Sequence, residues 1–285
     1  MREDRPSTTA LYVAMGRAIA HTEARSSGFS DPIARELLPD DARRLVDLHA
    51  SGQQPRRLRD RWTLRVARRV SRMMTLRTLA IDDAIRSAPD RGQIVILGAG
   101  LDARAWRMDE LRESVVFEVD HPATQAAKRE RTAALRPVAR EVRFVPVDFQ
   151  RGSLEAALER AGQDPSRPTL WLWEGVIRYL SRDAIEATLD AIASRSAPGS
   201  RLVVNYTTRS GASRFLSNLV LSAIGEPIRS SISPAGFASL LATRGFAVIS
   251  DTDATALAAR ASVRAGRFDR WRWAGILHIV VAARS

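Results

Sequence analysis

The sequence predicts an α/β fold in which a doubly wound, seven-stranded and mostly parallel sheet follows a helical N-terminal segment. From Gln93 onward, short apolar runs alternate with segments of helical periodicity, which is typical of a parallel sheet covered by helices on both faces. The first run is apolar over residues 94–97, as expected of a strand buried on both sides. It stops at Gly98 and Gly100, and such a glycine turn between a strand and a helix is typical of a ligand-binding site.

The alternation predicts seven strands and five intervening helices. The expected strands are residues 94–97, 115–120, 142–147, 169–173, 201–206, 246–251 and 276–283. The expected helices are residues 103–111, 122–135, 153–161, 183–195 and 234–244. The last two strands are separated by a polar, arginine-rich stretch that lacks the pattern of a regular crossover helix. We therefore expect them to pair antiparallel at the end of the sheet.

Two domains are expected. Residues 1–91 form a helical cap that covers the substrate, and residues 92–285 form the core, with a lid insertion at about residues 207–233. The lid segment is apolar and is flanked by Gly211 and Gly225, which suits a lid between hinges. A contact between two copies in a homodimer is the competing interpretation of the same segment.

A long helix is predicted over residues 61–87, and it carries an unusual arginine. At 3.6 residues per turn, one stripe contains Trp62, Val66, Val70, Met73, Ala80, Ile81 and Ala84. Arg77 falls inside this stripe. An unpaired buried guanidinium is costly, so Arg77 needs an anionic partner, which is either a ligand or a structural carboxylate such as Asp82 or Asp83.

Composition excludes several classes of site and location. The chain has no cysteine, which excludes disulfides, thiolate zinc sites and cysteine nucleophiles, and its four histidines are far apart in sequence, so no metal site is expected. No stretch approaches the roughly 20 apolar residues of a membrane span, and the N-terminus lacks the apolar run of a secretory signal. We therefore expect a cytoplasmic protein without membrane contact.

The net charge of +12 comes almost wholly from arginine, since Lys128 is the only lysine. Such a charge is found in nucleic-acid-binding proteins. The arginines are scattered, however, and those of residues 56–72 fall mostly on one side of a helix, as on a solvated face. A general preference for arginine therefore explains the charge better than a nucleic-acid partner.

Four consecutive strands end at a glycine turn or an acid. Their ends carry Gly98-Ala99-Gly100, then Glu118 and Asp120, then Asp148 and Phe149, and then Glu174. In an open α/β sheet, ligands bind beyond these carboxyl ends. Asp120 follows the glycines by about 20 residues, the separation at which a carboxylate reaches the ribose hydroxyls of a cofactor. Asp148 and Phe149 offer a carboxylate and an aromatic ring to an adenine.

Four motifs together resemble a known family. They are LGAGLD at 97–102, FEVD at 117–120, VDF at 147–149 and WEGVIRYL at 173–180. The set is similar to class I S-adenosylmethionine-dependent methyltransferases of the leucine carboxyl methyltransferase type, and most similar to their bacterial branch, which includes carboxyl O-methyltransferases of aromatic polyketides. The likeness covers about residues 9–206. It implies a Rossmann-like sheet with an antiparallel last strand inserted.

The resemblance also implies roles for matching residues toward S-adenosyl-L-methionine. Arg77 pairs with the methionine carboxylate, Gly98, Ala99 and Gly100 let the backbone approach the methionyl group, Asp120 holds the ribose with Glu118 close by, Asp148 and Phe149 border the adenine, and Glu174 faces the ammonium group. Two features depart from the family. Arg178 stands where an apolar residue is expected, and residues 17–21 show no counterpart of the basic residue that eukaryotic members use near the methyl group.

The implied reaction is O-methylation of a small-molecule or peptide acceptor that bears a carboxylate or a hydroxyl. A carboxylate is already ionised near neutral pH and needs no base, and the sequence shows no obvious base, which favours a carboxylate. Arg178 is the candidate that orients the acceptor, with Tyr206 as a second wall of its pocket. The alternative for Arg178 is a surface charge.

Two other functions compete. A nicotinamide-dependent oxidoreductase also uses the pattern G-x-G-x-x-A, which residues 98–103 fit, but about 90 residues precede the glycines and Lys128 lies far from a useful tyrosine. An arginine-rich RNA-binding or RNA-methylating protein would suit the charge. The Asn-Pro-Pro-aromatic run that base N-methyltransferases carry after the fourth strand is missing from this sequence.

Overall fold

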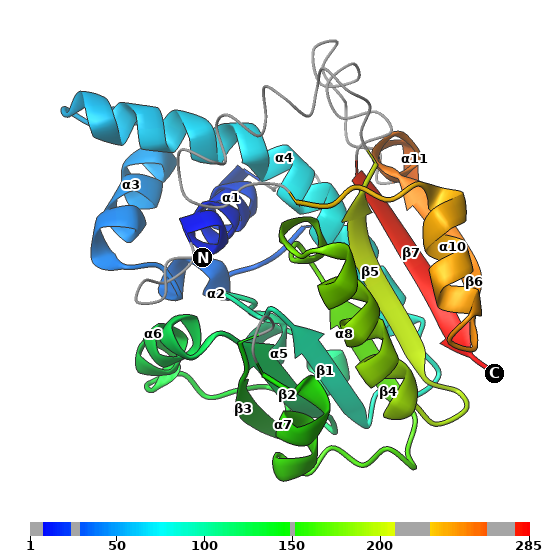
Figure 1. The fold of residues 1–285 in the computed structure, drawn as a ribbon. Helices are drawn as coiled ribbons and strands as arrows, with labels where there is room; N and C mark the ends of the chain where they lie inside the picture. The colour runs from blue at the N-terminus through cyan, green and yellow to red at the C-terminus, as the bar shows by residue number, and fades with distance from the viewer. Residues whose placement is uncertain (1–7, 24–28, 149–151, 209–228, 261–276) are drawn as a thin grey trace.

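The computed structural model describes residues 8–23, 29–148, 152–208, 229–260 and 277–285. A single seven-stranded sheet runs through it, with helices on both faces (Figure 1). The strands are β1 (Gln93–Leu97), β2 (Val115–Asp120), β3 (Glu141–Pro146), β4 (Thr169–Trp173), β5 (Arg201–Thr207), β6 (Phe246–Asp253) and β7 (Leu277–Arg284). The predicted fold class is confirmed, and the seven predicted strands lie within a few residues of the observed ones.

The strand order is β3-β2-β1-β4-β5-β7-β6. Strands β1 to β5 are parallel, and β7 lies between β5 and β6 and runs antiparallel to both. The predicted antiparallel pairing of the last two strands is confirmed. The chain direction across the sheet reverses between β1 and β4, so the carboxyl ends of these two strands flank the point where open α/β sheets bind ligands.

Each face of the sheet has its own apolar core. On one face, the helices α7 (Leu154–Arg160), α8 (Arg182–Ser194) and α10 (Pro234–Ala242) cover a core that contains Trp171 and Trp173, both fully buried. On the other face, the core is built from the second half of α4 (Leu58–Arg86) and the segment around α5 (Arg104–Arg107), and it includes Ile81, Ile96 and Trp106. Helix α6 (Pro122–Thr132) follows β2, and the side chain of His121, the residue before it, caps it by accepting the Ala123 amide.

The N-terminal helices form a separate cluster above the sheet edge. Helices α1 (Thr8–Glu23), α2 (Ile33–Glu36) and α3 (Asp40–Ala50) pack with the first half of α4 around an apolar core that includes Met15 and Leu38 (Figure 1). At 1.5 Å per residue, α4 is roughly 43 Å long. It therefore belongs to both units: its first half packs in the cap and its second half packs on the sheet.

One part of the long-helix prediction is wrong. Trp62 was expected on the inward stripe of α4, but its side chain is 51% exposed. The face that meets α1 instead carries Leu64, Ala67 and Ser71, which are buried. The small side chains let the helices approach closely, and a Cβ added to Gly16 of α1 would lie 3.4 Å from Ser71 Cα. Packing against α1, which periodicity does not register, therefore selects the buried face.

Two helix predictions also need correction. The helix expected over 103–111 is broken into α5 and the 3₁₀ turn Asp109–Leu111, because Met108 between them is extended. The stretch before the last strand, expected to lack a helix, contains α11 (Ala254–Arg260), and the Asp253 carboxylate accepts the Ala256 amide at its first turn.

Most of the predicted lid falls outside the described residues. Of residues 207–233, the structure describes 207–208 and 229–233. Within the described residues, none of the helices combines the length and the apolar character that a membrane crossing requires.

Candidate functional site

The turn after β1 packs tightly against the turn after β4. Gly98 and Gly100 have φ angles of +66° and +51°, a left-handed conformation that favours glycine. A Cβ on Gly98 would collide with the side chain of Val176, which follows β4. The amides of Gly98 and Ala99 both donate to the Val119 carbonyl, at 2.8 and 3.0 Å. Backbone from β1, β2 and β4 thus meets at the strand ends.

Asp120 joins the end of β2 to this turn. Its carboxylate accepts the amide hydrogens of Gly100 and, at 2.6 Å, of His121. Burial raises the pKa of Asp120, and these amide hydrogen bonds oppose the increase. A carboxylate has about four acceptor positions, so two hydrogen bonds leave room for two hydroxyl donors. The predicted ribose-binding role therefore has the chemical capacity that it needs.

Glu118, two residues earlier on β2, has a different partner. Its Oε2 lies 2.6 Å from Lys128 Nζ of α6, and both side chains are 1% exposed. Burial raises the pKa of Glu118 to about 7, against the effect of Lys128. Lys128 also lies 5.0 Å from the ring centre of Trp106. Glu118 therefore ties α6 to the sheet, and its predicted place near a ribose stays a prediction.

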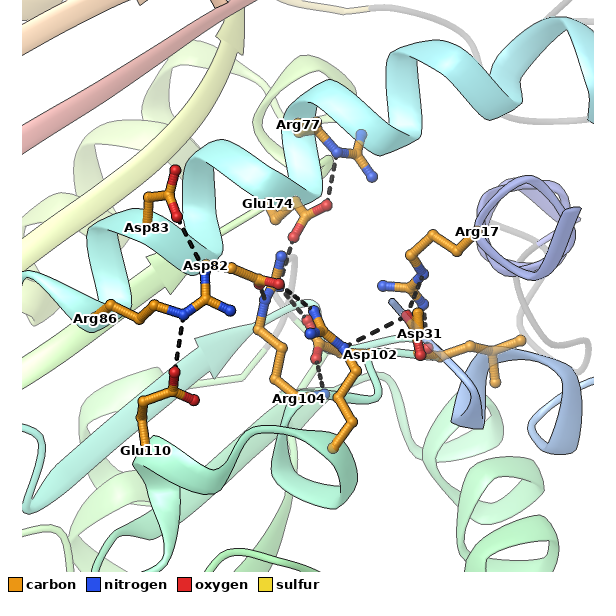
Figure 2. A network of polar contacts seen from close by, with 12 residues as sticks. Arg17, Asp31, Arg77, Asp82, Asp83, Arg86, Asp102, Arg104, Glu110 and Glu174 are labelled. Atoms are coloured by element: carbon orange, nitrogen blue, oxygen red, sulfur yellow. Dashed lines mark hydrogen bonds and ion pairs between the residues drawn. The ribbon is translucent and has the colours of Figure 1, made fainter. Parts of the chain in front are cut away.

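The end of β4 carries the second half of the candidate site. Glu174 Oε1 lies 2.6 Å from Arg77 Nε, and both side chains are buried (Figure 2). The inward position of Arg77 on α4 is confirmed, and its partner is neither Asp82 nor Asp83. Burial lowers the pKa of Arg77. Burial alone would raise the pKa of Glu174, but the arginines around it outweigh burial and hold that pKa far below its usual range.

Arg104 is the centre of a larger buried network around this pair. Its guanidinium is fully buried and lies 2.7 Å from both Asp82 and Glu174, and it also contacts Asp102 (Figure 2). Burial alone would lower the pKa of Arg104, but the three carboxylates outweigh burial and raise it. One arginine thus holds together α4, the glycine turn and the end of β4.

The network continues into the cap. Arg107 bridges Asp82, at 2.7 Å, and Asp31, at 3.6 Å, and Asp31 lies 3.5 Å from Arg17 of α1. Arg17 also donates to the Leu101 carbonyl in the glycine turn. Within the described residues, the connected groups are four arginines (Arg17, Arg77, Arg104, Arg107) and four carboxylates (Asp31, Asp82, Asp102, Glu174). Their formal charges cancel, as burial requires.

Sequence reasoning missed most of this network. It found no basic residue of interest in residues 17–21, yet Arg17 is 3% exposed and faces the glycine turn. The available signal was weak: Arg17 lies beside the apolar stripe of α1. For Arg104, the signal was an Asp-x-Arg sequence directly after the glycine turn, where the Asp102 carboxylate accepts the Arg104 amide at 2.8 Å.

The remaining predicted cofactor contacts lie after β3. The Val147 amide donates to the Asp120 carbonyl at 2.9 Å, which brings Asp148 to the strand end beside Asp120. Phe149 lies outside the described residues. The structure thus brings Gly98, Gly100, Asp120, Asp148, Arg77 and Glu174 to one edge of the sheet. Their contacts with a cofactor stay predictions.

The two predicted acceptor residues lie on the β4 and β5 side of this edge. Arg178 is half-buried in the 3₁₀ turn Ile177–Tyr179, 5.2 Å from the Tyr179 ring centre, and its charge lowers the pKa of Arg77. Tyr206 is 1% exposed and donates its hydroxyl to Asp251. Contact of either residue with an acceptor stays a prediction.

Comparison with known proteins decides the family. A profile of the leucine carboxyl methyltransferase family matches residues 10–193, more than half of the chain. The chain belongs to the leucine carboxyl methyltransferase family. The predicted resemblance is confirmed. The matched part includes the cap, the glycine turn and the first four strands of this family member.

Curated relatives agree. A protein of Mycolicibacterium paratuberculosis is 38% identical over 205 residues, which are 70% of this chain and 65% of that protein. A protein of Frankia alni is 36% identical over 214 residues, which are 73% of this chain and 71% of that protein. Both are described as S-adenosyl-L-methionine-dependent methyltransferases. The match to the first relative thus spans slightly less than two thirds of its length.

Solved structures support the fold. A protein from Thermobifida fusca described as a methyltransferase superposes with a TM-score of 0.63 at 17% identity, covering 99% of this chain and 96% of that chain. A DUF574 family protein from Streptomyces avermitilis has a TM-score of 0.56 at 12% identity, covering 95% and 97%. At these identities, the likeness concerns the fold alone.

Proposed function

We propose that this chain is an S-adenosylmethionine-dependent methyltransferase that acts on an oxygen of a small-molecule or peptide acceptor. The observation that carries the proposal is the buried pair of Arg77 and Glu174 beside the glycine turn. The amino-acid end of the cofactor has one carboxylate and one ammonium group. One buried cation and one buried carboxylate, side by side at the point where the strand order reverses, match that pair of charges.

The other residues at the sheet edge fit the rest of the cofactor. The glycine turn brings backbone to the carboxyl end of β1, where Gly98, Ala99 and Gly100 would lie along the methionyl chain. Asp120 retains acceptor capacity for two ribose hydroxyls. Asp148 follows the next strand, where an adenine amino group would find an acceptor.

When bound, the cofactor would supply a methyl group activated by a positive sulfur. The protein would hold donor and acceptor in line and exclude water. Arg77 and Glu174 would fix the amino-acid end, and Asp120 would fix the ribose. Arg178 is the proposed side chain that holds a polar group of the acceptor, since it lies on the β4 side of the edge, close enough to affect the pKa of Arg77.

The acceptor oxygen belongs to either a carboxylate or a hydroxyl. The sequence favours a carboxylate because no general base is evident in it. The structure changes this premise: it places an imidazole and a carboxylate within hydrogen-bonding distance of each other next to β5.

Isothermal titration calorimetry tests the proposed function without knowledge of the acceptor. The ligands are S-adenosylhomocysteine, NAD and a short single-stranded RNA, titrated into separate samples of the full chain. We expect micromolar affinity for S-adenosylhomocysteine alone. Binding of NAD alone, or salt-sensitive binding of RNA alone, would contradict the proposal and support one of the two competing functions.

A further inference from the structure

Half of the ligand-binding edge is not used by the proposed cofactor contacts. Those contacts lie at the ends of β1, β2, β3 and β4, on one side of the sheet. On the other side, β5 ends and β7 begins at the same edge, because β7 is antiparallel to β5. The acceptor must reach the methyl group through space that the cofactor does not occupy. The ends of β5 and β7 are therefore where acceptor chemistry is expected.

Strand register places two polar side chains there. Trp173 of β4 lies opposite Val204 of β5, and Val204 lies opposite Val280 of β7. Two residues farther toward the edge, Tyr206 lies opposite His278. Neighbouring strands are about 4.8 Å apart, and β5 is the one strand between β4 and β7. The backbone of His278 is therefore roughly 10 Å from β4, near the end of that strand, where Glu174 follows.

His278 is held by a carboxylate. Its Nδ1 lies 3.0 Å from Oδ1 of Asp251 on β6, and the other oxygen of Asp251 accepts the hydroxyl of Tyr206. The ring centroids of Tyr206 and His278 are 5.1 Å apart. The ring centroid of Phe237 from α10 lies 4.8 Å from that of Tyr206. The imidazole is thus fixed by a hydrogen bond and by ring packing.

The contact with Asp251 also selects a tautomer. A carboxylate beside Nδ1 accepts a hydrogen bond from an N–H at that nitrogen, so Nε2 of the neutral ring carries the lone pair. No hydrogen bond to Nε2 is seen within the described residues. Two other polar groups lie nearby. Burial and the hydrogen bond to Asp251 raise the pKa of Tyr206, so its hydroxyl stays protonated. Asp253 lies opposite His278 in register, and its carboxylate caps α11.

We infer that His278 is the general base of the reaction, that Asp251 and Tyr206 are positioning residues, and that the acceptor oxygen is a hydroxyl of an alcohol or phenol. This inference rests on the proposed function. A carboxylate acceptor is ionised near neutral pH and gains nothing from a base, whereas a hydroxyl must lose its proton as the new bond forms. A histidine oriented by a carboxylate is suited to that proton transfer.

The proposed step moves one proton and one methyl group. The acceptor O–H proton moves to His278 Nε2, and the freed electron pair on oxygen forms a bond to the methyl carbon. The carbon–sulfur bond breaks and its electron pair stays on sulfur, so the positive sulfonium becomes a neutral thioether. The imidazolium then releases its proton to water. The products are a methyl ether, S-adenosylhomocysteine and one proton.

Nitrogen-15 NMR of the histidine rings tests the geometry without an acceptor or turnover. With S-adenosylhomocysteine bound, we expect His278 to be the Nδ1–H tautomer when neutral, and we expect Asp251→Asn to abolish this preference. His49→Ala, which changes a ring paired with Glu23 in the cap, serves as the assignment control. A neutral Nε2–H tautomer of His278 in the wild-type protein would overturn the inference.

A methylation assay tests the chemistry. S-adenosylmethionine is supplied with a mixture of phenols, alcohols and carboxylic acids, and products are read by mass spectrometry. We expect methyl ethers, with a loss of kcat of roughly 100- to 10,000-fold in His278→Ala and a recovery as pH is raised, while the affinity for S-adenosylhomocysteine is unchanged. Methyl esters alone, or wild-type kcat in His278→Ala, would overturn the inference. If no product forms, the NMR result decides on the inference. A wild-type protein that does not bind S-adenosylhomocysteine would refute the proposed function instead.

Discussion

Arg77 of α4 and Glu174 after β4 form a buried ion pair with 2.6 Å between Nε and Oε1. The pair connects two elements. Arg77 belongs to α4, which packs in both the cap and the sheet, and Glu174 follows β4, which lies next to β1 and its glycine turn. Each side chain is the other's counterion. A zwitterionic amino-acid ligand can take over both contacts without a change in the net charge of the site.

Arg77→Ala is therefore expected to weaken S-adenosylhomocysteine binding by about 1–3 kcal/mol, the range for a hydrogen bond to a charged group. Calorimetry measures the change. Arg69→Ala, which removes an exposed arginine from the same helix, is the matched control and should keep wild-type affinity. Equal affinities of the two variants would remove Arg77 from the cofactor site.

Asp120→Ala is expected to lower the same affinity by about 1–3 kcal/mol, because the ribose hydroxyls would lose their acceptor. The variant also frees the Gly100 amide, so its thermal unfolding must be recorded beside the titration. Asp109→Ala, at an exposed carboxylate that pairs only with Arg112 within the described residues, is the control. Wild-type affinity in Asp120→Ala would argue against a ribose at the end of β2.

Arg104→Met tests the hub of the network. The variant leaves three buried carboxylates without their shared cation, and breaking a buried ion pair costs about 3–5 kcal/mol. Urea unfolding measures the loss. The comparison is Arg86→Met, where about 0–1 kcal/mol is expected. The Arg86 side chain is 46% exposed and contacts Asp83 and Glu110 (Figure 2). Similar losses in both variants would show that Arg104 is no more important than a surface arginine.

The free energy of unfolding should depend on pH through Glu118. Burial raises its pKa from 4.5 to about 7 in the folded protein, so folding favours the protonated carboxyl. Its stabilising contribution is complete below about pH 4.5 and is lost as the pH rises to about 7. Urea unfolding between these pH values should show a decline in wild-type stability that is smaller in Glu118→Gln.

Lys128 complicates this measurement, because Glu118→Gln leaves its ammonium group buried without a counterion. The double variant Glu118→Gln/Lys128→Met removes both charges and should lack the same part of the pH dependence. Identical slopes in the wild type and the double variant would mean that Glu118 does not change its proton affinity on folding.

Arg178→Ala should raise KM for the acceptor and leave the affinity for S-adenosylhomocysteine unchanged, because the proposed contact is with the acceptor alone. Steady-state kinetics with an acceptor from the methylation assay, together with calorimetry, separates the two effects. Arg182→Ala, at an exposed arginine in the first turn of α8, is the control. A wild-type KM in Arg178→Ala would return Arg178 to the surface-charge interpretation.

Local sequence patterns were enough for the fold class and for much of the site. Strand and helix periodicity are properties of neighbouring residues, and they predicted the seven strands and the inward position of Arg77. The acids and glycines of the site directly follow strands, and the ends of parallel strands meet at one edge of a sheet. For this reason the sequence alone located Gly98, Asp120, Asp148 and Glu174 at a common edge.

Only the tertiary structure decided which of these side chains contact one another. The pairing of Arg77 with Glu174, the contacts of Arg104 with Asp82 and Glu174, and the contact of His278 with Asp251 all join segments far apart in the chain. The exposure of Trp62 was likewise decided by the face that α1 covers. Such contacts depend on strand order, register and helix packing, which are set by the burial of the whole apolar core and leave no local trace in the sequence.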